Sequence, residues 1–121
     1  MQLKNNLSLI LFFFLFSCSG IRPLAKEKQF SEGFKKKIVL VKKEMLVKNY
    51  SRARAILNNI DIKKLKPIEA AEKYNVLGLI DFGENKHSVA KQRFIKALSF
   101  DFEQPELINQ IVLNIASAEY K

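Results

Sequence analysis

The position of Cys18, the single cysteine of the chain, marks it as a site of covalent chemistry. It follows the apolar run Leu9–Phe16 and one serine, Ser17. A thiol can carry a thioether-linked lipid, and several acyl chains anchor a protein firmly where one anchors it marginally, at roughly 0.8 kcal/mol per buried methylene. An exported protein with one thiol also has no internal disulfide partner. Cys18 is therefore a candidate site for covalent attachment of a lipid.

The other residue types offer no catalytic or metal-binding set. His87 is the only histidine, and with Cys18 assigned to a lipid, neither a cysteine–histidine metal site nor a cysteine nucleophile can be assembled. Glu69 and Glu72 are better explained as charges near the start of a helix than as a general-acid pair. The four glycines are too scattered to form a phosphate-binding loop. The sequence predicts no enzymatic activity, no metal and no cofactor.

The tetrad Leu15–Cys18 resembles a bacterial lipobox, the processing signal of lipoproteins. The apolar run before it is shorter than the ~20 residues of a membrane-spanning helix and is typical of a secretory signal. The resemblance implies that residues 1–17 are a signal peptide that is removed. It also implies that residues 18–29 are a lipidated amino terminus and flexible tether.

Ser19, directly after the cysteine, resembles the outer-membrane type of the Gram-negative sorting rule. The resemblance implies a protein of the bacterial cell envelope, lipid-anchored at the outer membrane and facing the periplasm. The alternatives are an ordinary cleaved signal, an uncleaved anchor and a buried cysteine in a cytosolic protein.

The chain is basic, with 21 Lys and Arg against 12 Asp and Glu and a formal net charge of +9. Removing residues 1–17 takes away only one charge, Lys4, and leaves roughly a hundred residues, enough for one small domain. A positive surface attracts anionic lipid headgroups, cell-wall polymers or acidic protein patches. Export makes nucleic acid an unexpected partner, and charge spread over solvated helix faces is the alternative.

Residues 30–121 show helical periodicity. Apolar residues recur at spacings of three and four at Phe34, Ile38, Val41 and Met45. We expect Ser31 and Glu32 to cap the helix they predict. Further helices are predicted at about 51–60, 67–82, 86–100 and from 105 to the chain end, with Pro67 and Pro105 in first turns and Gly83 as a left-handed terminator. About five helices joined by short turns predict an all-α fold with antiparallel neighbours.

Small and large apolar residues alternate at defined intervals in the later helices. The set is Tyr74, Leu77, Gly78, Ala90, Phe94 and Ala97. It resembles the tetratricopeptide repeat (TPR), a 34-residue helix–turn–helix unit. The resemblance implies that Gly78 and Ala90 are small because two helices touch there, with Phe94 filling the space beside them. Asp81 stands where the family usually carries an aromatic residue.

A degenerate earlier copy begins near Phe34. Ala53 and Leu57 match Ala90 and Phe94, and Val41 takes the place of Gly78. The helix from Pro105 then resembles the first half of a third unit and acts as a cap. The alternative is a generic five-helix bundle.

In the TPR family, partner peptides usually lie in a concave groove lined by the first helix of each repeat. Carried over position by position, the resemblance implies a groove lined by Lys35, Ile38, Lys42, Met45, Asn75, Leu79, Phe82, Asn109 and Leu113. Leu79 and Phe82 are large apolar residues at outward positions, so they form either a docking patch or a surface covered by the amino-terminal segment.

The function predicted from these features is that of a membrane-anchored TPR-like lipoprotein. It acts as a protein-binding or scaffold module of the cell envelope, with an envelope protein or peptide as its partner. Two alternatives stay open: a basic electrostatic adaptor for anionic cell-wall polymer or lipid headgroups, and a regulatory subunit of an envelope enzyme.

Overall fold

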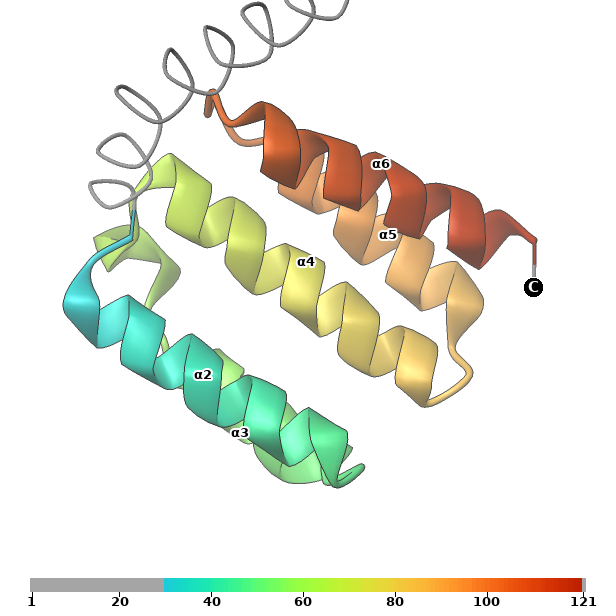
Figure 1. Ribbon diagram of the computed structural model, residues 1–121, viewed down its shortest axis with the longest axis horizontal. Helices are drawn as coiled ribbons and strands as arrows, with labels where there is room; N and C mark the ends of the chain where they lie inside the picture. The colour runs from blue at the N-terminus through green and yellow to red at the C-terminus, as the bar shows by residue number, and fades with distance from the viewer. Residues whose placement is uncertain (1–29, 121) are drawn as a thin grey trace, which may run out of the picture.

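The computed structural model describes residues 30–120, which form helices and contain no β-strand (Figure 1). The helices are α2 (Glu32–Leu46), α3 (Tyr50–Asn58), α4 (Pro67–Gly83), α5 (His87–Leu98) and α6 (Pro105–Glu119), with a 3₁₀ turn, η1 (Ile62–Lys64), between α3 and α4. The predicted all-α class is confirmed. Cys18, the signal peptide at 1–17 and the tether at 18–29 lie outside the described residues.

Local chemistry explains where most of the helices begin. The Ser31 hydroxyl accepts a hydrogen bond from the Phe34 amide at 3.3 Å and caps α2. Pro67 and Pro105 open α4 and α6, where a missing N–H costs nothing. The predicted start signals of these three helices are therefore confirmed.

The prediction that Gly83 is a left-handed terminator is wrong. Gly83 is the last residue of α4 and has no positive φ, and the left-handed residue of this turn is Asn85 at φ 63°. Asparagine tolerates that conformation because its short polar side chain bonds locally. Gly83 is small for another reason, since a Cβ there would lie 2.7 Å from Cζ of the Tyr50 ring.

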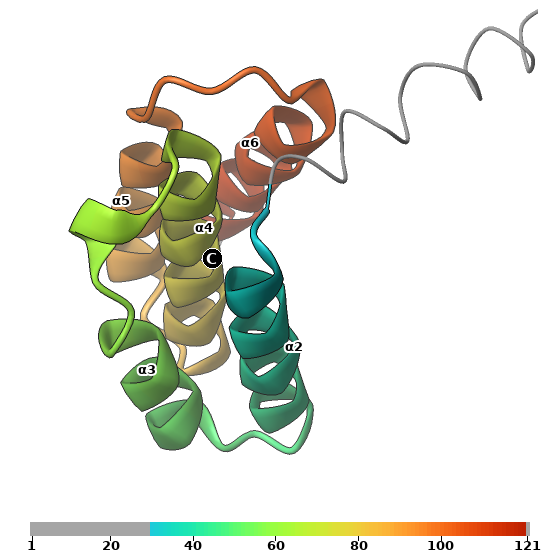
Figure 2. The same cartoon turned by 90° about the vertical axis from the view of Figure 1, so that its left-hand side faces the viewer.

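The helices stack as two hairpins and a final helix. Helix α2 pairs with α3, α4 pairs with α5, and α6 packs against α5 and α4. Figure 2 shows α3 and α5 along one side and α2 and α6 along the other, with α4 between them. Two apolar clusters fill the stack, one around α2, α3 and α4 and the other around α4, α5 and α6. Helix α4 is thus the central element.

The two hairpins use equivalent residues for their internal contact. Thirty-seven residues separate Val41 from Gly78, Ala53 from Ala90, and Leu57 from Phe94. All but Gly78 are hydrophobic residues with no exposed surface, and Gly78 is buried as well. A Cβ at Gly78 would lie 2.6 Å from Cδ1 of Phe94. The arrangement is repeat-like, with the glycine allowing α4 and α5 to approach closely.

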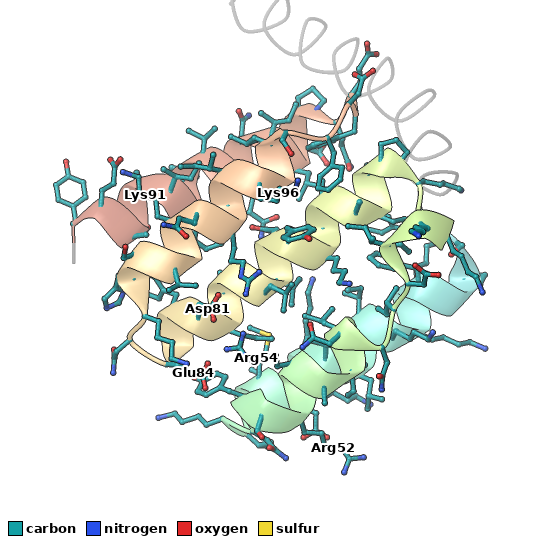
Figure 3. All side chains as sticks on the ribbon, turned by 180° about the vertical axis from the view of Figure 1, so that it is seen from behind. Arg52, Arg54, Asp81, Glu84, Lys91 and Lys96 are labelled. Atoms are coloured by element: carbon teal, nitrogen blue, oxygen red, sulfur yellow. The ribbon has the colours of Figure 1, made fainter. Side chains whose placement is uncertain are left out.

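An ionic cluster joins the first hairpin to the second. Asp81 on α4 is 2% exposed, and its carboxylate pairs with Arg54 of α3 at 2.9 Å and with Arg93 of α5 at 3.3 Å. Arg54 also pairs with Glu84. Figure 3 shows Arg54, Asp81 and Glu84 together at the junction of α3 with α4. Asp81 therefore holds three helices at one point.

A second polar link joins the starts of α2 and α4 through the buried carboxylate of Glu69. It accepts hydrogen bonds from the Lys66 amide at 2.9 Å, the Ser31 amide at 2.8 Å and the Ser31 hydroxyl at 2.9 Å. Burial raises the pKa of Glu69, but these hydrogen bonds outweigh it and the net pKa lies below the usual value. The ionised carboxylate therefore stabilises the fold.

Glu69→Gln should lower the free energy of unfolding by about 1–2 kcal/mol at neutral pH, because the amide is a weaker acceptor. A lowered pKa in the folded state means that the contribution is present above the unfolded value, near 4.5, and is lost as pH falls through the folded pKa. Urea unfolding at a series of pH values should show the two proteins converging in acid. Glu103→Gln, on an exposed connection, is the control; a constant gap between the Glu69 variant and the parent would contradict the prediction.

Candidate functional site

The residues predicted to line a groove come from α2, α4 and α6, and the structure divides them by exposure. Lys42, Asn109 and Leu113 are exposed; Lys35, Met45, Leu79 and Phe82 are half-buried; Ile38 and Asn75 are buried. Ile38 belongs to the core between α2 and α3. The buried pair therefore corrects the expectation that all of these side chains face an open groove.

Asn75 is buried because α4 and α6 meet over it. Its side-chain oxygen accepts a hydrogen bond from Nδ2 of Asn114 at 2.9 Å, and its own Nδ2 donates to Glu72 at 3.2 Å. Asn114 was not among the predicted residues. The spacing of Asn114 from Ile111 and Ala118 was the available signal. Residues three and four positions apart share a helix face, and a polar residue on an apolar face needs a partner.

Glu72 lies beside this amide pair with a carboxylate that is almost fully buried. Burial raises its pKa above the usual value, and the charge of Lys42 on α2 together with the Asn75 hydrogen bond only partly offsets this. The ionised form of Glu72 therefore costs stability. A charge held at such a cost between α2, α4 and α6 makes Glu72 a candidate site residue.

Glu72→Gln should raise the free energy of unfolding at neutral pH, by on the order of 1 kcal/mol, because it removes a poorly solvated charge and keeps the acceptor for Asn75. A raised pKa in the folded state means that folding favours the protonated form, so the parent gains stability as pH falls below that pKa. The variant's advantage should therefore vanish in acid. Thermal unfolding at neutral and acidic pH measures it, and a variant less stable than the parent at neutral pH would refute it.

A small cavity of about 160 Å³ lies next to these polar groups. Its lining consists of Leu79, Phe82, Phe94, Asn114 and Ser117. Phe94 is fully buried and belongs to α5, whereas Asn114 and Ser117 belong to α6. Engineered apolar cavities of about 150 Å³ accept a benzene-sized molecule. The cavity therefore has room for one apolar side chain next to polar groups that could bind a peptide backbone.

His87 stands at the start of α5, and its ring packs edge-on against Phe82 with centroids 4.7 Å apart. Its Nδ1 atom is buried without a hydrogen-bond partner among the described residues. Within residues 30–120, no three His, Asp or Glu side chains gather closely enough to hold a metal ion. In the same range, none of the helices has the length and apolar content needed to cross a bilayer.

Searches of protein-family models, of curated proteins and of solved structures find no match to this chain.

Proposed function

We propose that this protein is a lipid-anchored, TPR-like binding module of the bacterial envelope, without enzymatic activity. The observation that carries the proposal is the cavity at Leu79 and Phe82, between α4 and α6 in a repeat-like stack. Support for the TPR relationship comes from the equivalent contacts of the two hairpins, above all Gly78 against Phe94. Support for the anchor comes from Cys18 and the apolar run before it.

The cavity fits a peptide that inserts one apolar side chain. Leu79 and Phe82 form its apolar wall. Asn114 and Ser117 of α6 supply their side-chain oxygens as acceptors, since Asn114 Nδ2 already donates to Asn75 and Ser117 Oγ to the Leu113 carbonyl. On the neighbouring α2, the exposed Lys42 favours acidic residues in the same peptide. The partner we propose is therefore an acidic segment of an envelope protein with a single apolar anchor residue.

Phe82→Ala should weaken partner binding by about tenfold or more, because the aromatic wall that contacts the inserted apolar side chain is lost. The lipidated parent and variant are each used for affinity capture from the native envelope, and companions are identified by mass. Ile95→Ala, which shortens an exposed side chain on α5, is the matched control. Proteins that co-purify with the parent and the control but not with the variant support the proposal. The same co-purifying proteins in all three would contradict the assignment of the cavity as the binding site. Melting temperatures of the three proteins test whether the fold is intact.

The electrostatic adaptor is the second candidate, and the basic composition favours it. Binding through exposed lysines alone should collapse at high ionic strength, since salt screens exposed charges beyond about 10 Å at 0.1 M. Binding through the cavity should persist. Repeating the capture in high salt separates the two functions.

Metabolic labelling with palmitate tests the anchor. Label incorporated by the parent and absent from Cys18→Ser is the expected result, whereas an unlabelled parent would remove the lipoprotein part of the proposal.

A further inference from the structure

Helix α2 and the residue that follows it, Val47, carry apolar side chains on the side away from the core contacts of α2. Val39, Leu40, Leu46 and Val47 are 55%, 42%, 83% and 73% exposed. Lys36 and Lys43 lie among them on the same side and form no ion pair within residues 30–120. We call these six residues the outer face of α2. Figure 1 shows α2 and α3 at the end of the stack opposite α6.

The outer face has a counterpart in α4 that shows what such a face normally does. The offset of 37 residues relates Val39 to Val76 and Leu40 to Leu77. In α4, both residues are buried in the cluster shared with α2 and α3. The outer face of α2 therefore has the apolar character of a packing face, but no described helix covers it.

One difference between α2 and α4 decides what kind of surface can cover the outer face of α2. Lys43 occupies the position equivalent to Ile80, which is fully buried. A helix packed dryly on α2, from a second copy or another protein, would bury the Lys43 ammonium at a large desolvation cost unless it supplied a carboxylate. An anionic lipid surface accepts both features, because apolar residues enter the headgroup boundary while lysine side chains extend to the phosphates.

The position of α2 in the chain agrees with a lipid surface as the partner of its outer face. From Cys18 to Phe30 the backbone spans at most about 40 Å at roughly 3.3 Å per residue. If Cys18 carries the anchor proposed above, on which this step rests, α2 is the first described helix after the bilayer. Its outer face is then within reach of the headgroups.

We infer that the outer face of α2 is a second membrane contact that lies on an anionic lipid surface. Leu46 and Val47 enter the headgroup boundary, and Lys36 and Lys43 bind lipid phosphates. The contact turns α2 toward the bilayer.

The chain offers a direct test because it contains no tryptophan and one cysteine. Leu46→Trp places a single fluorescent reporter on the outer face, and Ile95→Trp places a matched one on α5. Each full-length protein is coupled through Cys18 to a maleimide-bearing lipid in vesicles of chain-brominated phosphatidylcholine, with or without phosphatidylglycerol. The proteins are made by cell-free synthesis, which leaves the Cys18 thiol free for coupling. Because the anchor is then supplied chemically, the result does not depend on whether the cell lipidates Cys18.

The expected result is that bromine quenches the reporter at position 46 in vesicles with phosphatidylglycerol, and quenches the reporter at position 95 much less. Adding Lys36→Glu and Lys43→Glu should weaken the surface contact by at least about tenfold, whereas Lys64→Glu with Lys96→Glu, an equal change in net charge, should not. Equal quenching at the two positions, or quenching indifferent to phosphatidylglycerol, would overturn the inference. Cross-links joining α2 of two copies would overturn it in favour of self-association.

Discussion

Gly78→Leu is expected to lower the free energy of unfolding by about 3 kcal/mol, at the upper end of the range for overpacked cores. Even a Cβ at this position would lie 2.6 Å from Cδ1 of Phe94. The Phe94 ring has no exposed surface and cannot swing into solvent. Relief therefore requires α4 and α5 to separate, which disturbs the most extensive helix contact of the fold. Chemical denaturation with circular dichroism measures the loss.

A glycine elsewhere provides the control. Gly33 is exposed in the first turn of α2, and a Cβ there meets nothing within 4 Å. Gly33→Ala should therefore keep or raise stability, by up to about 1 kcal/mol from helix propensity, whereas Gly78→Ala should lower it. Phe94→Leu, which removes the ring, should make Gly78→Ala less harmful. If both alanine substitutions stabilised the protein, α4 and α5 would not approach as closely as described.

Features that depend on neighbouring residues were predictable from the sequence. Ser31 before an apolar-periodic segment, and prolines at 67 and 105, mark helix starts through backbone hydrogen bonding alone. The role of Gly78 at a close contact between two helices was predictable through the resemblance, because its spacing from Phe94 matches that of the TPR pattern. Gly83 shows the limit of local reasoning, since a glycine near a helix end predicts a terminator unless the approaching Tyr50 ring is known.

The polar links between distant segments were not predictable in this way. Glu69 binds Ser31 across 38 residues, and Asn75 binds Asn114 across 39. Each depends on which faces of α2, α4 and α6 come together, and helical periodicity alone does not determine this. The groove prediction was affected for the same reason, because position within a repeat does not reveal that α6 covers Asn75.

Asp81→Ala should lower the free energy of unfolding by about 2–3 kcal/mol. It removes a carboxylate that bonds two guanidinium groups, and a hydrogen bond to a charged group contributes roughly 1.5–3 kcal/mol net, with less lost where water compensates an exposed partner. Compensation is incomplete for Arg54, whose side chain is 25% exposed, and larger for Arg93, at 39%. The loss should therefore come mainly from the Arg54 pair.

A double-mutant cycle isolates that pair. Asp81→Ala and Arg54→Ala, alone and together, should give a coupling energy above about 1 kcal/mol. The Lys91–Glu119 pair, 2.8 Å long and with side chains 41% and 53% exposed, is the matched control and should give about 0.5 kcal/mol or less. Equal coupling energies in the two cycles would show that the Arg54–Asp81 pair does not hold α3 and α4 together.

The ion pair of Arg54 and Asp81 also bears on function, because it joins the two hairpins. Helix α3 contacts α4 less extensively than α5 does, so Arg54 and Asp81 bond across the weaker junction. The outer face of α2 lies on one side of this junction and the Leu79–Phe82 cavity on the other. Loosening it by Asp81→Ala should therefore change the orientation of the cavity relative to α2 while leaving the α4–α5 contact at Gly78 intact. Faster amide hydrogen exchange in α2 and α3 than in α5 would show this, whereas uniform acceleration would mean that the hairpins unfold as one unit.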